Sequence, residues 1–295
     1  MFIRSRKFIL LALVSSILLL SQLPLLITTF WPVAYQGKVQ SHFYLPDQAG
    51  PDKPAPLIVV FGGSEGGIPW AHSKSASQRQ HYLDAGFALL AIGYFGLPDT
   101  PAGLDRIELT SIIAAIDNAA AQPGVRAENI TLLGTSKGAE LALLLASRNS
   151  NISTVVSVVG ADAVFGSSEW YSTSSSWVWQ QQPVSFVPID LRSVLPTLVH
   201  GDLRRSYELA MQNHSAYQRA KIPVEQMQAD VLFISGTADE VWPSSEMSDR
   251  MMARLQQHQY PFAYQHLKIE GAGHGGLGNK YQPEIMAFIQ KSQQR

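Results

Sequence analysis

ITLLGTSKG, the stretch from Ile130 to Gly138, joins a short apolar run to a helical pattern through the motif Gly-x-Ser-x-Gly. The aliphatic run Ile130–Leu133 predicts a buried strand, and Lys137–Ser147 has the spacing of a helix. A serine on a glycine-flanked turn from strand to helix is typical of a nucleophile elbow. The motif alone is weak evidence, and its place between strand and helix is what indicates a nucleophile at Ser136.

Short apolar runs alternate with helical patterns on both sides of this motif. The expected strands are Pro56–Phe61, Phe87–Tyr94, Ser153–Gly160, Val231–Ser235 and Phe262–Ile269, after leading strands within Tyr35–Leu45. The expected helices are Leu104–Ala121, Ser245–Gln257 and Pro283–Gln290. Strands separated by helices predict an α/β fold with a doubly wound, mostly parallel sheet.

Two later loops carry the partners that a nucleophilic serine needs. Asp239 follows the strand that ends at Ser235, and the adjacent Glu240 is a rival acid. His274 follows the last strand, in a loop that reads GAGHGG. The resulting order, Ser, Asp, His, is the one expected for a nucleophile elbow on such a sheet. We therefore expect Ser136 to attack an acyl carbon, His274 to move its proton and Asp239 to orient the imidazole.

Two backbone donors are expected to stabilise the oxyanion. One is the N–H of Lys137, the residue after the nucleophile, and the other comes from the glycine-rich loop Gly62–Gly67, where Ser64 and Gly63 are the candidates. This loop lacks the spacing of a phosphate-binding loop. Lys137 and Glu140 are three residues apart on the helix, so they form either a simple ion pair at the helix start or a device that positions the elbow.

The segment Ala161–Gln228 is the irregular part of the chain. Its early part is rich in Ser and Gln and contains Trp170, Trp177 and Trp179. A connection of this length inside an α/β fold is typical of a lid or a binding element, and the alternative is a cover over the sheet edge. We take the three tryptophans as candidate substrate-binding residues.

The amino-terminal run Phe8–Phe30 contains no charge and follows three basic residues. Its length predicts a transmembrane helix with the amino terminus in the cytoplasm. Residues 1–34 are then a cytoplasmic stub and a signal anchor. Residues 35–295 form a catalytic domain outside the cytoplasm, in the periplasm if the source is bacterial. A cleaved secretory signal is the alternative.

Composition excludes several classes of protein. The 22 Lys and Arg residues nearly balance 23 Asp and Glu residues, which argues against nucleic-acid binding. The chain is 46% hydrophobic and 15% charged, which is too apolar for a disordered protein. It has no cysteine, so disulfides, thiolate zinc sites and cysteine nucleophiles are excluded. No histidine–carboxylate cluster has the spacing of metal ligands, so neither a metal nor a cofactor is expected.

The elbow segment resembles that of the acyl-CoA thioester hydrolase / bile acid-CoA:amino acid N-acyltransferase family, in its C-terminal catalytic domain. The shared signature is Ser136-Lys137-Gly138, followed by Glu140 and Leu141. Other resembling segments, which together cover about residues 56–276, are Val59–Gly67, Gly93–Pro98, Ile222–Glu225 and Gly236–Trp242. Dienelactone hydrolases are more distant relatives.

The resemblance implies an α/β-hydrolase fold, an acyl-CoA thioester substrate and the triad Ser136, Asp239 and His274. In the family a cysteine nucleophile goes with acyl transfer to amino acids, so a serine implies hydrolysis. We expect a serine hydrolase of acyl thioesters or esters, bound to a membrane through residues 8–30. The alternatives are a carboxylesterase, a dienelactone-hydrolase-like enzyme or a peptidase with an extracytoplasmic substrate. A non-catalytic protein of the same fold that binds a lipid or a partner is a third reading.

Overall fold

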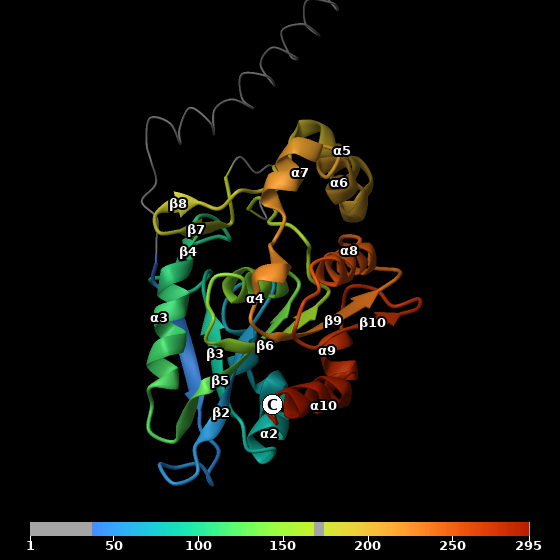
Figure 1. Ribbon diagram of the computed structural model, residues 1–295. Helices are drawn as coiled ribbons and strands as arrows, with labels where there is room; N and C mark the ends of the chain where they lie inside the picture. The colour runs from blue at the N-terminus through green and yellow to red at the C-terminus, as the bar shows by residue number, and fades with distance from the viewer. Residues whose placement is uncertain (1–36, 168–173, 295) are drawn as a thin grey trace, which may run out of the picture. The chain divides into compact units, whose positions relative to one another are not determined.

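The computed structural model describes residues 37–167 and 174–294. Seven strands in these residues form one sheet (Figure 1). All neighbouring strands are parallel except the first pair, which is antiparallel. The order across the sheet is β1 (Gln40–Tyr44), β3 (Ala88–Gly93), β2 (Ala55–Phe61), β5 (Val125–Thr135), β6 (Ile152–Val158), β9 (Asp230–Gly236) and β10 (Tyr264–Ile269).

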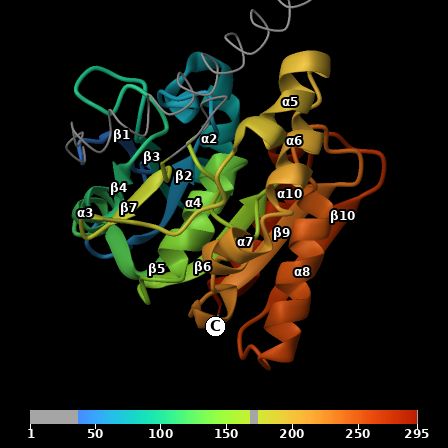
Figure 2. The same cartoon turned by 90° about the horizontal axis from the view of Figure 1, so that it is seen from above.

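Helices cover both faces of this sheet (Figure 2). One face packs against α3 (Leu109–Ala120), α4 (Lys137–Ala146) and α8 (Ser244–Gln257). The other packs against α2 (Ala76–Asp84), α9 (Leu277–Lys280) and α10 (Gln282–Ser292). The central strands are apolar on both faces because both faces are buried. The prediction of a doubly wound, mostly parallel sheet is confirmed.

The long connection between β6 and β9 contains regular elements that we did not predict. Its hairpin of β7 (Trp177–Trp179) and β8 (Gln182–Pro183) pairs with β4 (Ile107–Glu108). The helices α5 (Leu191–His200), α6 (Leu203–Ala210) and α7 (His214–Ala220) follow. Each begins after an Asp or Asn whose side chain accepts a backbone N–H of the first turn, namely Asp190, Asp202 and Asn213. Residues of these helices pack onto the segments that leave β6 and β9.

One helix that we did not predict and one helix that begins later than predicted both have physical reasons. Helix α2 was missed because it buries only Tyr82 and so lacks an apolar stripe. The helix expected over Leu104–Ala121 begins at Leu109 instead. The residues just before it pair with β7, and the Glu108 carboxylate accepts the Thr110 N–H as a cap.

Within residues 37–167 and 174–294, no helix is long and apolar enough to cross a membrane. The longest described helix, α8, has 14 residues and is about 21 Å long, against about 30 Å of hydrocarbon. The predicted anchor at residues 8–30 lies outside the described residues. We expected a single-pass membrane protein with a cytoplasmic amino terminus and an extracytoplasmic catalytic domain. The absence of a spanning helix from the described residues corrects this expectation, which is wrong.

Candidate active site

Ser136 occupies a sharp turn between β5 and α4. Its φ of 56° and ψ of −122° lie in a region that residues with a side chain rarely adopt. The backbone N–H of Ser136 donates to Val158 O at 2.9 Å, which ties the turn to the neighbouring strand. A Cβ atom at Gly134 would lie 2.1 Å from Gly138 O, and one at Gly138 would lie 2.2 Å from Gly62 O. The turn can close only because both positions are glycine.

The structure brings Ser136, Asp239 and His274 into one hydrogen-bonded row. The Nε2 atom of His274 lies 2.9 Å from Ser136 Oγ. The Nδ1 atom of the same ring lies 2.9 Å from each carboxylate oxygen of Asp239. Ser136 and His274 are 138 positions apart in the sequence, and they meet because β5, β9 and β10 end at the same edge of the sheet.

The carboxylate of Asp239 is buried and fully occupied. Besides His274, it accepts the backbone N–H groups of Val241 at 2.9 Å and Trp242 at 3.2 Å, and the Ser244 hydroxyl at 2.5 Å. Burial alone would raise the pKa of Asp239, but the hydrogen bonds from His274, Ser244 and the Val241 N–H outweigh it, so this pKa lies below its ordinary value. Asp239 therefore carries a negative charge beside the imidazole.

Glu240 takes a different role from Asp239. Its side chain is exposed, and its Oε2 accepts the backbone N–H of His274 at 2.9 Å. Among the described residues, its carboxylate is hydrogen-bonded to the backbone of the histidine loop, whereas the Nδ1 atom of the imidazole is bonded to Asp239. Arg204, from α6, donates from its side chain to Asp239 O at 3.0 Å and from its backbone to Glu240 O at 3.2 Å. The long connection between β6 and β9, which we call the insertion, thus supports the loop that carries both acids.

The glycine-rich loop after β2 packs directly against the serine turn. A Cβ atom at Gly63 would lie 3.2 Å from Ser136 Cβ. The Tyr94 hydroxyl, from the end of β3, lies 2.7 Å from Gly62 O and 3.2 Å from Gly63 O. In a planar trans peptide the N–H points opposite to the C=O, so the N–H groups of Gly63 and Ser64 face away from Tyr94. Both candidates for the second oxyanion donor are thus oriented by the same hydroxyl.

Lys137 and Glu140 form a buried ion pair and not an exposed one. Their side chains are 1% and 0% exposed, and Lys137 Nζ lies 2.7 Å from Glu140 Oε1. Lys137 also donates to Phe165 O at 3.2 Å, while Glu140 accepts from Trp177 Nε1 at 2.7 Å and from Phe165 N at 3.3 Å. Burial lowers the pKa of Lys137 and raises that of Glu140, and the pairing opposes both shifts.

The three tryptophans proposed to bind substrate have different surroundings. Trp177 is fully buried and its N–H is bonded to Glu140, so it exposes no surface. Trp179 is half-buried and lines a cavity of about 250 Å³ together with Arg148, and none of the three residues in the hydrogen-bonded row lines that cavity. Trp170 lies outside the described residues.

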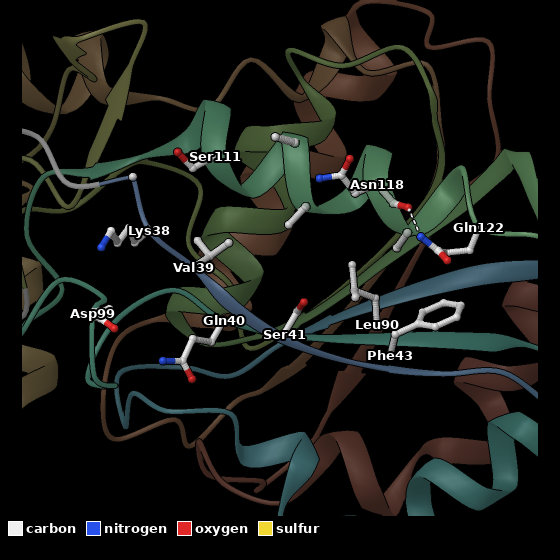
Figure 3. Close-up of a pocket in the computed structure, with 14 residues that line it drawn as sticks. Lys38, Val39, Gln40, Ser41, Phe43, Leu90, Asp99, Ser111, Asn118 and Gln122 are labelled. Atoms are coloured by element: carbon white, nitrogen blue, oxygen red, sulfur yellow. Dashed lines mark hydrogen bonds between the residues drawn. The ribbon is translucent and has the colours of Figure 1, made fainter.

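The structure has a sizeable cavity outside the serine turn. Its volume is about 840 Å³, and it lies between β1 and α3 (Figure 3). Lys38, Val39, Phe43 and Asn118 are among the residues that line it, and Ser136 is not. The geometry of the serine turn identifies the candidate site instead.

Sequence reasoning missed three supporting residues: Tyr94, Arg204 and Ser244. Ser244 lies five positions after Asp239, at the start of α8, where a hydroxyl is a common partner for a nearby carboxylate. Tyr94 ends a predicted strand and so was a visible candidate for the same sheet edge. Arg204 had no local signal, because its contact with the acid loop depends on how the insertion folds back.

A doubly wound sheet with a serine turn after β5, an acid after β9 and a histidine after β10 defines an α/β hydrolase. The family model described as "BAAT / Acyl-CoA thioester hydrolase C terminal" matches residues 109–294, more than half of the chain. The chain belongs to this family, and the resemblance noted in the elbow is confirmed.

Two curated mouse proteins are similar to most of the chain. Acyl-coenzyme A thioesterase 2, mitochondrial, is 29% identical over 223 residues, which are 76% of this chain and 45% of that protein. Peroxisomal succinyl-coenzyme A thioesterase is 28% identical over 245 residues, which are 81% of this chain and 52% of that protein. The chain spans about half the length of these relatives. Their names place them in mitochondria and peroxisomes, which also disagrees with the predicted extracytoplasmic location.

Solved structures agree on the fold. A puromycin-hydrolyzing peptidase from Mycobacterium tuberculosis superposes with a TM-score of 0.58 at 17% sequence identity. The match covers 88% of this chain and 39% of the peptidase. At this identity the likeness supports the α/β-hydrolase fold alone.

Proposed function

We propose that this protein is a serine hydrolase that cleaves acyl-CoA thioesters through an acyl-enzyme on Ser136. The observation that carries the proposal is the row of side chains in which His274 Nε2 lies 2.9 Å from Ser136 Oγ, with Asp239 on the other ring nitrogen. A hydroxyl in contact with a base that is itself oriented by a carboxylate is the arrangement of an activated nucleophile. The thioester substrate is carried over from the family and its named relatives.

The reaction would proceed in two steps, formation of the acyl-enzyme and its hydrolysis. Ser136 Oγ attacks the thioester carbonyl carbon while His274 Nε2 accepts the hydroxyl proton, and the Asp239 carboxylate stabilises the imidazolium. The tetrahedral intermediate collapses, the C–S bond breaks and the thiol leaves with the proton from His274. Water then attacks the carbonyl carbon of the acyl-enzyme while His274 Nε2 accepts a proton from the water. Collapse of this second intermediate breaks the bond between the carbonyl carbon and Ser136 Oγ, His274 returns the proton to Oγ, and the carboxylic acid is released. The N–H of Lys137 and one from Gly63 or Ser64 would bind the oxyanion.

Loss of the serine hydroxyl tests the proposal. We expect Ser136→Ala to lower kcat for acyl-CoA hydrolysis at least about a thousandfold, because the nucleophile is gone. The matched control is Ser73→Ala. Ser73 is exposed and lies in a short 3-10 helix, far from Ser136 in the sequence. Release of free thiol from acyl-CoA substrates of increasing acyl length is the measurement, and equal rates for Ser136→Ala and the wild type would contradict the proposal.

Simple p-nitrophenyl esters, offered in parallel, separate the proposed function from its alternatives. Ser136-dependent cleavage of these esters without cleavage of acyl-CoA would retain the nucleophile and remove the CoA substrate, which favours a carboxylesterase or a dienelactone-hydrolase-like enzyme. Absence of any Ser136-dependent turnover would favour the non-catalytic binding protein.

A further inference from the structure

We propose that one buried layer of side chains positions both halves of the oxyanion hole. The layer consists of Tyr94 beneath the glycine loop, and of Lys137, Glu140 and Trp177 beside the serine turn. We call these four residues the support layer. The inference rests on the proposed function, because an oxyanion hole has a role only if Ser136 forms a tetrahedral intermediate.

The half of the oxyanion hole that lies in the glycine-rich loop depends on a single hydroxyl. Tyr94 is 2% exposed, and its hydroxyl is within hydrogen-bond distance of both Gly62 O and Gly63 O. With these carbonyls held toward Tyr94, the N–H groups on the far side of the peptides face away from it. Burial, with the charges of Glu65 and Glu140, raises the pKa of Tyr94 well above its ordinary value, so the hydroxyl remains a proton donor.

The half of the oxyanion hole that lies at the elbow depends on the side chain of Lys137, the residue that supplies the donor. The backbone N–H of Lys137 belongs to the first turn of α4 and has no partner within the helix. The side chain of the same residue is anchored at Nζ by Glu140 and by Phe165 O. Trp177 Nε1 and Phe165 N hold the Glu140 carboxylate from the opposite side. Anchoring at both ends limits the rotation of the Lys137 peptide.

Trp177 joins the two halves. Its ring centroid lies 5.6 Å from that of Tyr94, at an interplanar angle of 55°. Lys137 Nζ lies 5.7 Å from the Trp177 ring, close enough for a cation–π contact. A shift of this indole would therefore disturb both the glycine loop and the elbow.

Stability alone does not explain a buried ion pair at this position. Apolar residues of similar volume often stabilise a core as well as a buried pair does, because the charges lose their hydration. The pair instead lies on the residue that supplies a candidate donor, and rigid support of such donors is what transition-state stabilisation requires.

Two variants remove one hydrogen-bonding group each. We expect Tyr94→Phe and Trp177→Phe to lower kcat for acyl-CoA hydrolysis about tenfold to a hundredfold, with KM changed less than about threefold. The matched control is Tyr82→Phe, which deletes a buried hydroxyl that has no hydrogen-bond partner among the described residues, on the other face of the sheet. Trp70→Phe is the control for the indole, since Trp70 is also buried on that face. We expect both controls to stay within about twofold of the wild type.

A tetrahedral adduct gives a readout that a purely structural role would not change. An acyl trifluoromethyl ketone forms an oxyanion on the serine, so its affinity should fall in parallel with kcat/KM in Tyr94→Phe and Trp177→Phe. A thioether analogue of acyl-CoA forms no oxyanion, so its affinity should remain near that of the wild type. Equal losses for both inhibitors would overturn the inference.

The double variant Lys137→Met/Glu140→Met separates positioning from stability. Replacing both charges with apolar side chains removes the pair without leaving a lone buried charge. We expect this variant to unfold at a urea concentration close to that of the wild type and yet to show a kcat reduced about tenfold or more. Wild-type kcat in this folded variant, or in folded Tyr94→Phe, would overturn the inference. Activity that survives Ser136→Ala would instead overturn the proposed function, so the two failures are distinguishable. If Trp177→Phe does not fold, Tyr94→Phe decides, because it deletes a single oxygen atom.

Discussion

Two adjacent carboxylates differ in role because their side chains point into different environments. Asp239 is 1% exposed and accepts hydrogen bonds from His274, Ser244 and two backbone N–H groups. Glu240 is exposed, and its carboxylate accepts the backbone N–H of His274 in the histidine loop. At the residue scale, burial and the number of donors distinguish the carboxylate that contacts the imidazole from the one that contacts the backbone of the histidine loop.

Exchange of each acid for its amide tests this distinction. We expect Asp239→Asn to lower kcat about a thousandfold to ten-thousandfold, because an amide neither stabilises an imidazolium nor keeps the ring nitrogen protonated as a carboxylate does. Glu240→Gln retains an acceptor for the His274 N–H, so its kcat should fall less than about tenfold. Steady-state hydrolysis of one acyl-CoA is sufficient for the comparison. A larger loss in Glu240→Gln than in Asp239→Asn would reverse the assignment.

At the scale of elements, the contact between β5, α4 and the loop after β2 has no spare volume. Gly138 lies in the first turn of α4, and a Cβ atom there would clash with Gly62 O. A Cβ atom at Gly134, near the end of β5, would clash with Gly138 O. The close approach of the helix to the strands is what places Ser136 at the helix amino terminus, where the backbone dipoles favour developing negative charge.

A single methyl group should break this contact. We expect Gly138→Ala to destabilise the fold by about 1–3 kcal/mol or more, because the new Cβ would lie 2.2 Å from Gly62 O and the backbone must move. The control is Gly50→Ala, where nothing lies within 4 Å of the added atom. Urea unfolding followed by circular dichroism measures both. Equal midpoints for the two variants would show that the elbow can relax.

At the scale of the whole molecule, His266 links the last two strands of the sheet to α8. Its Nε2 atom is hydrogen-bonded to Ser235 Oγ on β9 at 2.6 Å, and its Nδ1 atom to Asp249 Oδ1 on α8 at 3.1 Å. Burial lowers the pKa of His266 below its ordinary value, although the charge of Asp249 opposes this shift. The unfolded chain therefore binds this proton more readily than the folded one.

This linkage predicts the direction of a pH effect on stability. The contribution of His266 is fully present above the unfolded pKa of about 6.5 and is lost as the pH falls through the lower folded pKa. We expect the urea midpoint of the wild type to fall between pH 7.5 and pH 5, and His266→Gln to show a smaller fall over that interval. A fall of the same size in both proteins would remove His266 as its cause.

Local patterns predicted the central part of the fold well. The strands at 130–133 and 231–235, and the helix after Ser136, follow from continuous apolar runs and helical spacing, which are properties of the segments themselves. Helix α2 and the helices of the insertion were missed. The first buries one residue, and the others are stabilised by caps and by contacts with distant loops.

By itself, the sequence was sufficient to predict the parallel sheet and the family, and to nominate Ser136, His274 and an acid at 239 or 240 as neighbours. Their loops follow strands, and the carboxyl ends of parallel strands share one edge, so local order implied proximity. Tertiary structure alone decided which acid meets the imidazole, and it alone buried Lys137 with Glu140. Only tertiary structure placed the Tyr94 hydroxyl beneath the glycine loop. The physical reason is that burial and hydrogen-bond partners come from segments far apart in the chain, which no local spacing encodes.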